Sequence, residues 1–384
     1  MLKLRANELI KDCLTNFSNY EDVSLLDGSS GFLLLLLNLY LRENDEFYEN
    51  KAIKVIRKMD FNFSISNQNR GLWTGVIGLS YVVSLWKKYS CNEQLFERLD
   101  LQLSEASKMV IETYFIDEVT NFTYPINYDI LYGLAGIIIY TKYHEKFKND
   151  ENLDRRLSVL IEEVIQNNEK FNRFFCIDNT KELNNPTQDF AINFSLSHGI
   201  ISLINSALLL ENLDSSLLLD RLNGIYRNLV ENKARFPEFI KINSYDKQKI
   251  EFLYNKNNEN FSWCYGVYGH YIFQKNNNSY YFDSLKNKLS FHVRELIKND
   301  KMITNNVCFC HGLAGLLYSC NDGYSNKEVQ ACCKLLEKNY FNNEVLDEYS
   351  VWGVLDGKIG ILLSYIAIKY RKKIVGEEIF GIFG

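Results

Sequence analysis

Four residues that could bind a metal or transfer protons stand just ahead of glycines in the second half of the chain. Cys264 lies two residues before a glycine, Cys310 and His311 directly precede another, and His198 directly precedes a third. Two thiolates and one imidazole make a three-ligand zinc set with an open fourth position, which is typical of catalytic zinc sites. The remaining histidine has an ordinary pKa near neutrality and suits proton transfer.

These glycines belong to an internal repeat, in which Gly-x-x-Gly is followed by an apolar run. The first glycines of the seven copies are Gly28, Gly75, Gly133, Gly199, Gly266, Gly312 and Gly357. They are spaced by 47, 58, 66, 67, 46 and 45 residues, which is room for two helices and their loops. In the fourth copy Ser202 stands where the second glycine would fall.

The repeat predicts an all-α fold. Each copy pairs an apolar segment, which must be buried, with an amphipathic segment that can cover it. Seven such pairs favour one closed α/α toroid domain over residues 1–384, with seven inner and seven outer helices. An open solenoid is the alternative, but its terminal repeats would need polar faces, and the terminal copies here are among the most apolar. A solvated loop or hairpin is expected as an insertion around residues 213–260.

The shared position before the glycine predicts that the reactive residues meet. Equivalent loops of a closed ring lie at the same end, so Cys264, Cys310, His311 and His198 should converge on one mouth. Asp129, four residues before its glycine, could orient a histidine or cap a helix. Asp27 and Asp356 directly precede glycines and are expected to be caps. Taken singly, each of these residues could also have a purely structural role.

Composition excludes several classes of function. A net charge of −5 over 384 residues offers no basic surface for nucleic acid. The N-terminal residues lack the pattern of a signal peptide, and the apolar run 31–41 is too short to cross a bilayer. The nine cysteines are therefore expected to be reduced in a cytoplasmic protein. Cys308 is expected to pack, as are the cysteines away from the mouth, which are Cys13, Cys91, Cys176, Cys320, Cys332 and Cys333.

The motifs "YDILYGLAG", "SHGI", "SWCYG" and "CHGLAG" occur in this order on the glycine repeat. With them the chain, from about residue 25 to residue 367, resembles the lanthionine synthetase C-like family, and most of all its stand-alone lanthipeptide cyclases. The resemblance implies an α/α toroid with one zinc ion. It also implies addition of a peptide cysteine thiol to dehydroalanine or dehydrobutyrine, which forms the thioether rings of lantibiotics.

The resemblance also implies roles for particular residues. Cys264, Cys310 and His311 would hold zinc, and His198 would deliver a proton after the thiolate attacks. Asp129 would support His198 or the substrate, and Tyr265 would line the site. The sequence departs from the family at one position. Members of the family commonly have an arginine four residues before the cysteine of "WCYG", whereas this chain has Asn260 there.

The expected partners are a dehydrated precursor peptide and, by analogy with the family, a dehydratase and an exporter. These would bring the cyclase to the membrane surface without inserting it. One alternative is a relative without cyclase activity whose zinc holds a small thiol such as glutathione. Another is an unrelated toroid, either a glycosidase or a terpene cyclase. That would need paired catalytic carboxylates or an aspartate-rich motif at the mouth, and neither is evident in the sequence.

Overall fold

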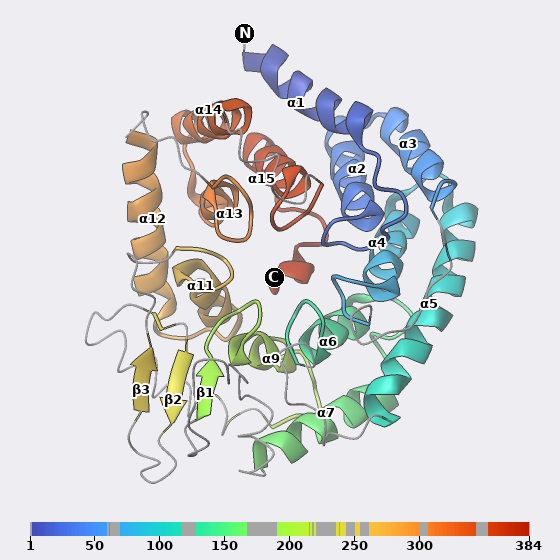
Figure 1. The fold of residues 1–384 in the computed structure, drawn as a ribbon, viewed down its shortest axis with the longest axis vertical. Helices are drawn as coiled ribbons and strands as arrows, with labels where there is room; N and C mark the ends of the chain where they lie inside the picture. The colour runs from blue at the N-terminus through green and yellow to red at the C-terminus, as the bar shows by residue number, and fades with distance from the viewer. Residues whose placement is uncertain are drawn as a thin grey trace, which may run out of the picture.

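Seven buried helices form an inner ring, each beginning directly after the first glycine of a copy. The computed structural model describes residues 2–59, 61, 70–116, 128–166, 190–214, 216, 219, 236–237, 239–242, 250–253, 261–298, 306–342 and 352–383. The inner helices are α2 (Ser29–Glu43), α4 (Val76–Tyr89), α6 (Leu134–Tyr143), α9 (Ile200–Ala207), α11 (Val267–Asn276), α13 (Leu313–Tyr318) and α15 (Lys358–Tyr370). Figure 1 shows them around a common centre.

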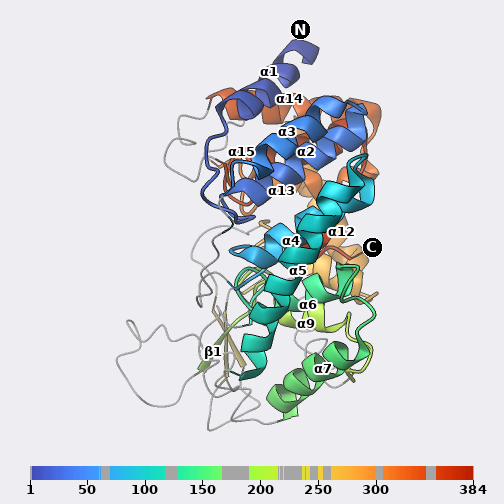
Figure 2. The ribbon, with the colours of Figure 1, turned by 90° about the vertical axis from the view of Figure 1, so that its right-hand side faces the viewer.

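A second set of helices surrounds this ring, as Figures 1 and 2 show. Within the described residues these are α1 (Leu2–Asn16), α3 (Glu46–Ile56), α5 (Glu93–Ile116), α7 (Glu151–Gln166), α12 (Phe282–Lys298) and α14 (Asn326–Asn342). They carry one apolar face toward the inner helices, as the amphipathic pattern requires. The predicted α/α toroid is therefore confirmed. None of the described helices combines the length and apolarity needed to cross a membrane.

Backbone hydrogen bonds join the seven loops ahead of the inner helices into a closed circle. In every junction the carbonyl oxygen two residues before the first glycine accepts from the preceding loop, at 2.9–3.3 Å. The donor and acceptor pairs are Leu25–Trp73, Trp73–Leu131, Ile130–Ser197, Leu196–Cys264, Trp263–Cys310, Phe309–Leu355 and Val354–Leu26. The last pair joins the seventh loop to the first, so the ring has no open edge.

The second glycine of a copy lets the inner helix approach its own loop. A Cβ atom on Gly315 would lie 2.0 Å from the carbonyl oxygen of Phe309, and one on Gly360 would lie 1.8 Å from that of Val354. Contacts this short do not occur between real atoms, so a side chain here would push the loop away. The glycine pairs thus fix the loops that carry the reactive residues.

The segment after α15 returns to the centre of the ring, where Figure 1 places the C-terminus. It contains a short 3-10 helix, η5 (Glu377–Phe380). The indole nitrogens of Trp73 and Trp263 donate to the carbonyl oxygens of Ile379 and Phe380 at 3.2 and 3.0 Å. The ring of Phe380 is fully buried and stacks on Phe309 with centroids 4.2 Å apart. The segment after α15 therefore fills the centre of the ring and packs against residues of several copies.

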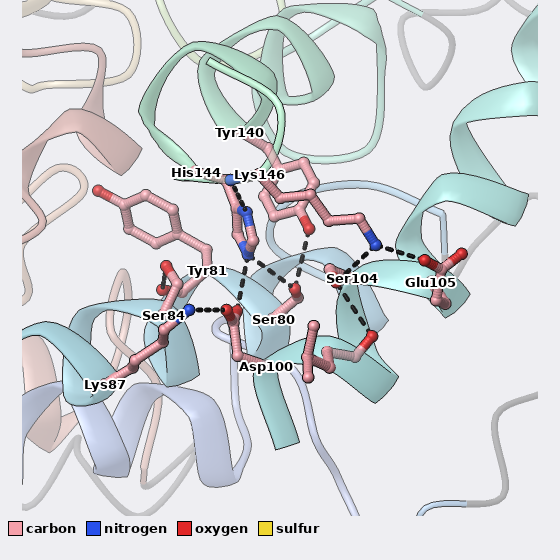
Figure 3. A network of polar contacts seen from close by, with 11 residues as sticks. Ser80, Tyr81, Ser84, Lys87, Asp100, Ser104, Glu105, Tyr140, His144 and Lys146 are labelled. Atoms are coloured by element: carbon pink, nitrogen blue, oxygen red, sulfur yellow. Dashed lines mark hydrogen bonds and ion pairs between the residues drawn. The ribbon is translucent and has the colours of Figure 1, made fainter. Parts of the chain in front are cut away.

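A buried polar network ties α4, α5 and the end of α6 together (Figure 3). Oδ1 of Asp100 accepts from Nε2 of His144 at 2.9 Å, and Lys87 donates to the other oxygen of Asp100 at 3.1 Å. Ser80 bonds the hydroxyl of Tyr140 at 2.8 Å. Burial by itself raises the pKa of Asp100, but the bonds from His144 and Lys87 outweigh it and hold that pKa below its usual range.

A small antiparallel sheet is attached to the helical ring. Its strands are β1 (Phe190–Asn193), β2 (Phe239–Ile242) and β3 (Ile250–Leu253), in the order β1-β2-β3. Two of them fall inside the predicted insertion at 213–260, where a loop or hairpin is expected. The glycine repeat did not predict the third strand, β1, which ends five residues before His198. Figure 2 places β1 on the opposite side of the ring from the C-terminus.

Candidate metal centre and active site

The residue directly before the first glycine is at least partly exposed in every copy. By contrast, most residues one position earlier are buried. The seven residues at this position are Asp27, Thr74, Tyr132, His198, Tyr265, His311 and Asp356. Because the hydrogen-bonded circle brings their loops together, these side chains surround one mouth, which we call the mouth ring. Three of its members were predicted site residues, namely His198, Tyr265 and His311.

Cys264, Cys310 and His311 form a compact donor set. One ligand atom from each lies within 4.8 Å of the others. The loops before α11 and α13 hold them, and the backbone amide of Cys264 donates to the carbonyl oxygen of Cys310 at 3.3 Å. Ligand atoms of a tetrahedral zinc site are about 3.3–3.8 Å apart, given zinc–sulfur and zinc–nitrogen bonds of about 2.0–2.3 Å. The donor types and the upper limit on their spacing are therefore compatible with zinc.

The three donors share protons in a way that favours a thiolate. The hydrogen bond from Cys310 lowers the pKa of Cys264 well below its ordinary value, against the effect of burial, and His311 adds to this. The same contact raises the pKa of Cys310. Hydrogen bonds to Cys264 and then Cys308 raise the pKa of His311 to about 11. A site that accumulates negative charge on sulfur is suited to a divalent cation.

His198 and Asp129 form a hydrogen-bonded pair at the mouth. Nδ1 of His198 lies 2.7 Å from Oδ2 of Asp129, whose side chain is fully buried. Burial by itself lowers the pKa of His198, but the bond to Asp129 and its charge outweigh this and raise the pKa. Burial also raises the pKa of Asp129. Since Nδ1 faces the carboxylate, Nε2 is the nitrogen of His198 that can exchange a proton with a substrate.

Asp129 contacts His198, as one of its two predicted roles requires, but it does not cap α6, whose N-cap is Gly133 without a side-chain cap hydrogen bond. Its Oδ1 accepts from the backbone amides of Tyr132 and Gly133 at 2.6 and 3.1 Å, at the start of α6. Its Oδ2 bonds His198. One carboxylate thus holds the loop that leads into a helix of the third copy and also holds the histidine of the fourth.

Tyr265 lies in the mouth ring beside Cys264. Its hydroxyl accepts a hydrogen bond from the side-chain amide of Asn193 at 3.4 Å, and its backbone amide donates to Ser262. Asn193 is the last residue of β1, so the small sheet reaches the mouth through this contact. Asn260, which stands in place of the arginine common in the family, lies outside the described residues.

Tyr132 and Asp356 are members of the mouth ring that were not predicted to belong to the site. The ring of Tyr132 lies parallel to that of His198, at 14° with centroids 6.2 Å apart. Asp356 was expected to be a cap, but the N-cap of α15 is Gly357, and Oδ1 of Asp356 makes no hydrogen bond. It faces His311 instead, with Oδ1 3.6 Å from Nδ1. The position directly before the glycine identifies both residues.

Cys308 is buried, as a packing residue should be, but it also lies in a second group that could hold a metal, with His311 and Asp356. Cys176 lies outside the described residues. The other cysteines that were expected to be structural have no place in either group of possible metal ligands among the described residues. Those on helices α1 and α14, which are Cys13, Cys332 and Cys333, are buried.

Comparisons with known proteins bear on the fold and the family of the chain. A search of the curated proteins finds no match. Among solved structures, nisin cyclase has a similar fold, with a TM-score of 0.69 and 18% sequence identity over 99% of this chain and 96% of that chain. The model of the lanthionine synthetase C-like protein family matches residues 19–379. That match spans nearly all of the ring, and the chain therefore belongs to the lanthionine synthetase C-like family.

Proposed function

We propose that the chain is a zinc-dependent lanthipeptide cyclase. Its reaction would add cysteine thiolates of a dehydrated precursor peptide to dehydroalanine or dehydrobutyrine, closing the thioether rings of a lantibiotic. The observation that carries the proposal is that a possible metal-binding group and a histidine–carboxylate pair lie at the same mouth. Three residues that could hold a metal ion lie in the same ring of loops as a histidine that a buried carboxylate holds.

Cys264, Cys310 and His311 would hold the zinc ion. When bound, zinc would keep the substrate thiol deprotonated near neutral pH. The three protein donors leave room for one further ligand in a tetrahedral site, and the substrate sulfur would take that place. The closed ring of loops brings these donors together before substrate arrives, so little reorganisation is needed.

His198 would complete the addition. The thiolate forms a carbon–sulfur bond at Cβ of the dehydro residue, and the electrons of the carbon–carbon double bond move to Cα as an enolate. A proton must then reach Cα, and Nε2 of His198 can deliver it while Nδ1 remains bonded to Asp129. The raised pKa of His198 keeps it protonated to higher pH. Tyr132 and Tyr265 flank this residue in the mouth ring and would restrict where the peptide can lie.

The partners and location follow from the same proposal. The substrate would be a peptide already dehydrated by another enzyme, so a dehydratase must act first on the same precursor. Closed rings are then available to an exporter, and the cyclase would work in the cytoplasm, at the membrane surface when bound to such a complex.

Ring closure can be tested directly by mass spectrometry. A dehydrated peptide incubated with the protein should lose free thiols, counted by alkylation, without a change in its mass. Cys264→Ala should lose bound zinc and activity, whereas His198→Ala should keep zinc and lose ring closure. Wild-type protein that closes no ring on several dehydrated peptides yet binds glutathione at its zinc would favour the thiol-binding relative and refute the cyclase.

A further inference from the structure

One carboxylate oxygen at the edge of the candidate metal centre is buried without a hydrogen bond. Oδ1 of Asp356 is buried and makes no hydrogen bond, although the residue as a whole is partly exposed. The cation two residues further along, Lys358, pairs with Asp12 at 3.3 Å. A buried carboxylate oxygen without a donor is costly, so its position needs a reason.

The group that Asp356 faces is His311. Nδ1 of His311 lies 3.6 Å from Oδ1 of Asp356, and the side chains are 45% and 41% exposed. The two residues occupy the same position in neighbouring copies, directly before Gly312 and Gly357. A hydrogen bond of about 2.9 Å would require the atoms to approach by about 0.7 Å, which rotation of two partly exposed side chains can supply.

We propose that Asp356 is the positioning carboxylate of the metal centre. It accepts the Nδ1 proton of His311 and so fixes the ring with Nε2 toward the metal. Histidine ligands commonly donate their second ring nitrogen to a carboxylate, which orients the ring and makes the ligating nitrogen more basic. The proposal rests on the zinc site of the proposed function and adds a residue that neither binds the ion nor touches the peptide.

The mouth ring supplies a matched control. Asp27 occupies the corresponding position in the first copy, one repeat further from His311 than Asp356. Both aspartates carry the same charge and both are partly exposed at the same mouth. An effect due only to the negative charge of the mouth should appear in both variants, whereas orientation of His311 should depend on Asp356 alone.

Zinc affinity, measured by competition with a chromogenic chelator, tests the proposal without any activity assay. Asp356→Ala should weaken zinc binding about 10- to 100-fold, the usual cost of losing such a partner. Asp356→Asn retains an acceptor oxygen and should lose less, and Asp27→Ala should stay within about 2-fold of wild type. The visible spectrum of the cobalt(II) protein should keep its two-thiolate character in all three variants.

Three results would overturn the proposal. Unchanged zinc affinity in Asp356→Ala would show that the carboxylate does not act on His311. A cobalt spectrum that reports a lost ligand in Asp356→Ala would make Asp356 a ligand itself. Loss of metal from Cys308→Ala but not from Cys264→Ala would place the ion in the second donor group. Wild-type protein that binds no zinc would instead refute the proposed function, so the two failures are distinguishable.

Discussion

Replacing Gly315 by alanine should weaken metal binding as well as the fold. The new Cβ would lie 2.0 Å from the carbonyl oxygen of Phe309, and the shortest contacts of real Cβ atoms are near 3.0 Å, so the gap must open by about 1 Å. That carbonyl belongs to the peptide bond between Phe309 and Cys310. A shift of this size exceeds the tolerance of about 0.2 Å on metal–ligand distances, so the Cys310 thiolate should be misplaced.

The expected losses are about 1–3 kcal/mol in the free energy of unfolding, as for other overpacked sites, and at least about 10-fold in zinc affinity, or 1.4 kcal/mol. Urea unfolding of the metal-free protein measures the first, and chelator competition measures the second. The fourth copy shows that a side chain can be accommodated here when the loop holds no metal ligand, because it carries Ser202 at this position.

Two other glycines separate the effects. Gly78 is the second glycine of the second copy, and a Cβ there would lie 2.2 Å from the carbonyl oxygen of Leu72, in a loop without metal ligands. Gly78→Ala should therefore destabilise the fold but leave zinc affinity unchanged. Nothing lies within 4 Å of a Cβ on Gly323, so Gly323→Ala should change neither. Equal zinc affinity in Gly315→Ala and Gly78→Ala would refute the link between helix packing and the metal loop.

Further predictions concern the proton-transfer pair, the metal and the core. Asp129→Asn should lower the pKa of His198, so the high-pH limb of a ring-closure rate profile should move to lower pH. A chelator should lower the melting temperature of wild-type protein but not that of Cys264→Ala, because only the former gains stability from a ligand. Asp100→Ala should cost about 3–5 kcal/mol in the free energy of unfolding by breaking a buried pair. Because folding lowers the pKa of this carboxylate, its contribution to stability is present above the unfolded pKa and is lost as the pH falls through the folded pKa. The stability of the variant should therefore fall less steeply with decreasing pH than that of wild type. Phe380→Ala should cost about 3–5 kcal/mol in urea unfolding.

Much of the arrangement could be predicted from the glycines. Their spacing and the apolar runs after them predicted the toroid, and the position before each first glycine predicted that the reactive residues share a mouth. Among the residues at that position, His198 and His311 were predicted to belong to the site because histidine commonly binds metals and transfers protons. Tyr132 and Asp356 occupy the same position but have common structural roles, so residue type alone did not distinguish them.

Other features depend on contacts that no periodic pattern encodes. Strand β1 has four residues and pairs with β2, which begins 46 residues after the end of β1. The sequence around β1 therefore contains no local signature of the pairing. The return of residues 375–383 to the centre depends on indole donors in distant copies, Trp73 and Trp263. The contact between His311 and Asp356 likewise cannot be predicted without knowing which loops are neighbours in the closed ring.

The hydrogen-bonded circle of loops also restricts how such a protein can change. An open stack of repeats can gain or lose a unit at either end, because only one interface is altered. Here the carbonyl oxygen of Leu26 accepts from Val354 and completes the last junction, so deleting any copy would leave two loops facing the wrong partners. The number of units is therefore fixed by closure. Variation can enter through the segments between copies, where insertions such as the small sheet lengthen the chain without breaking the circle.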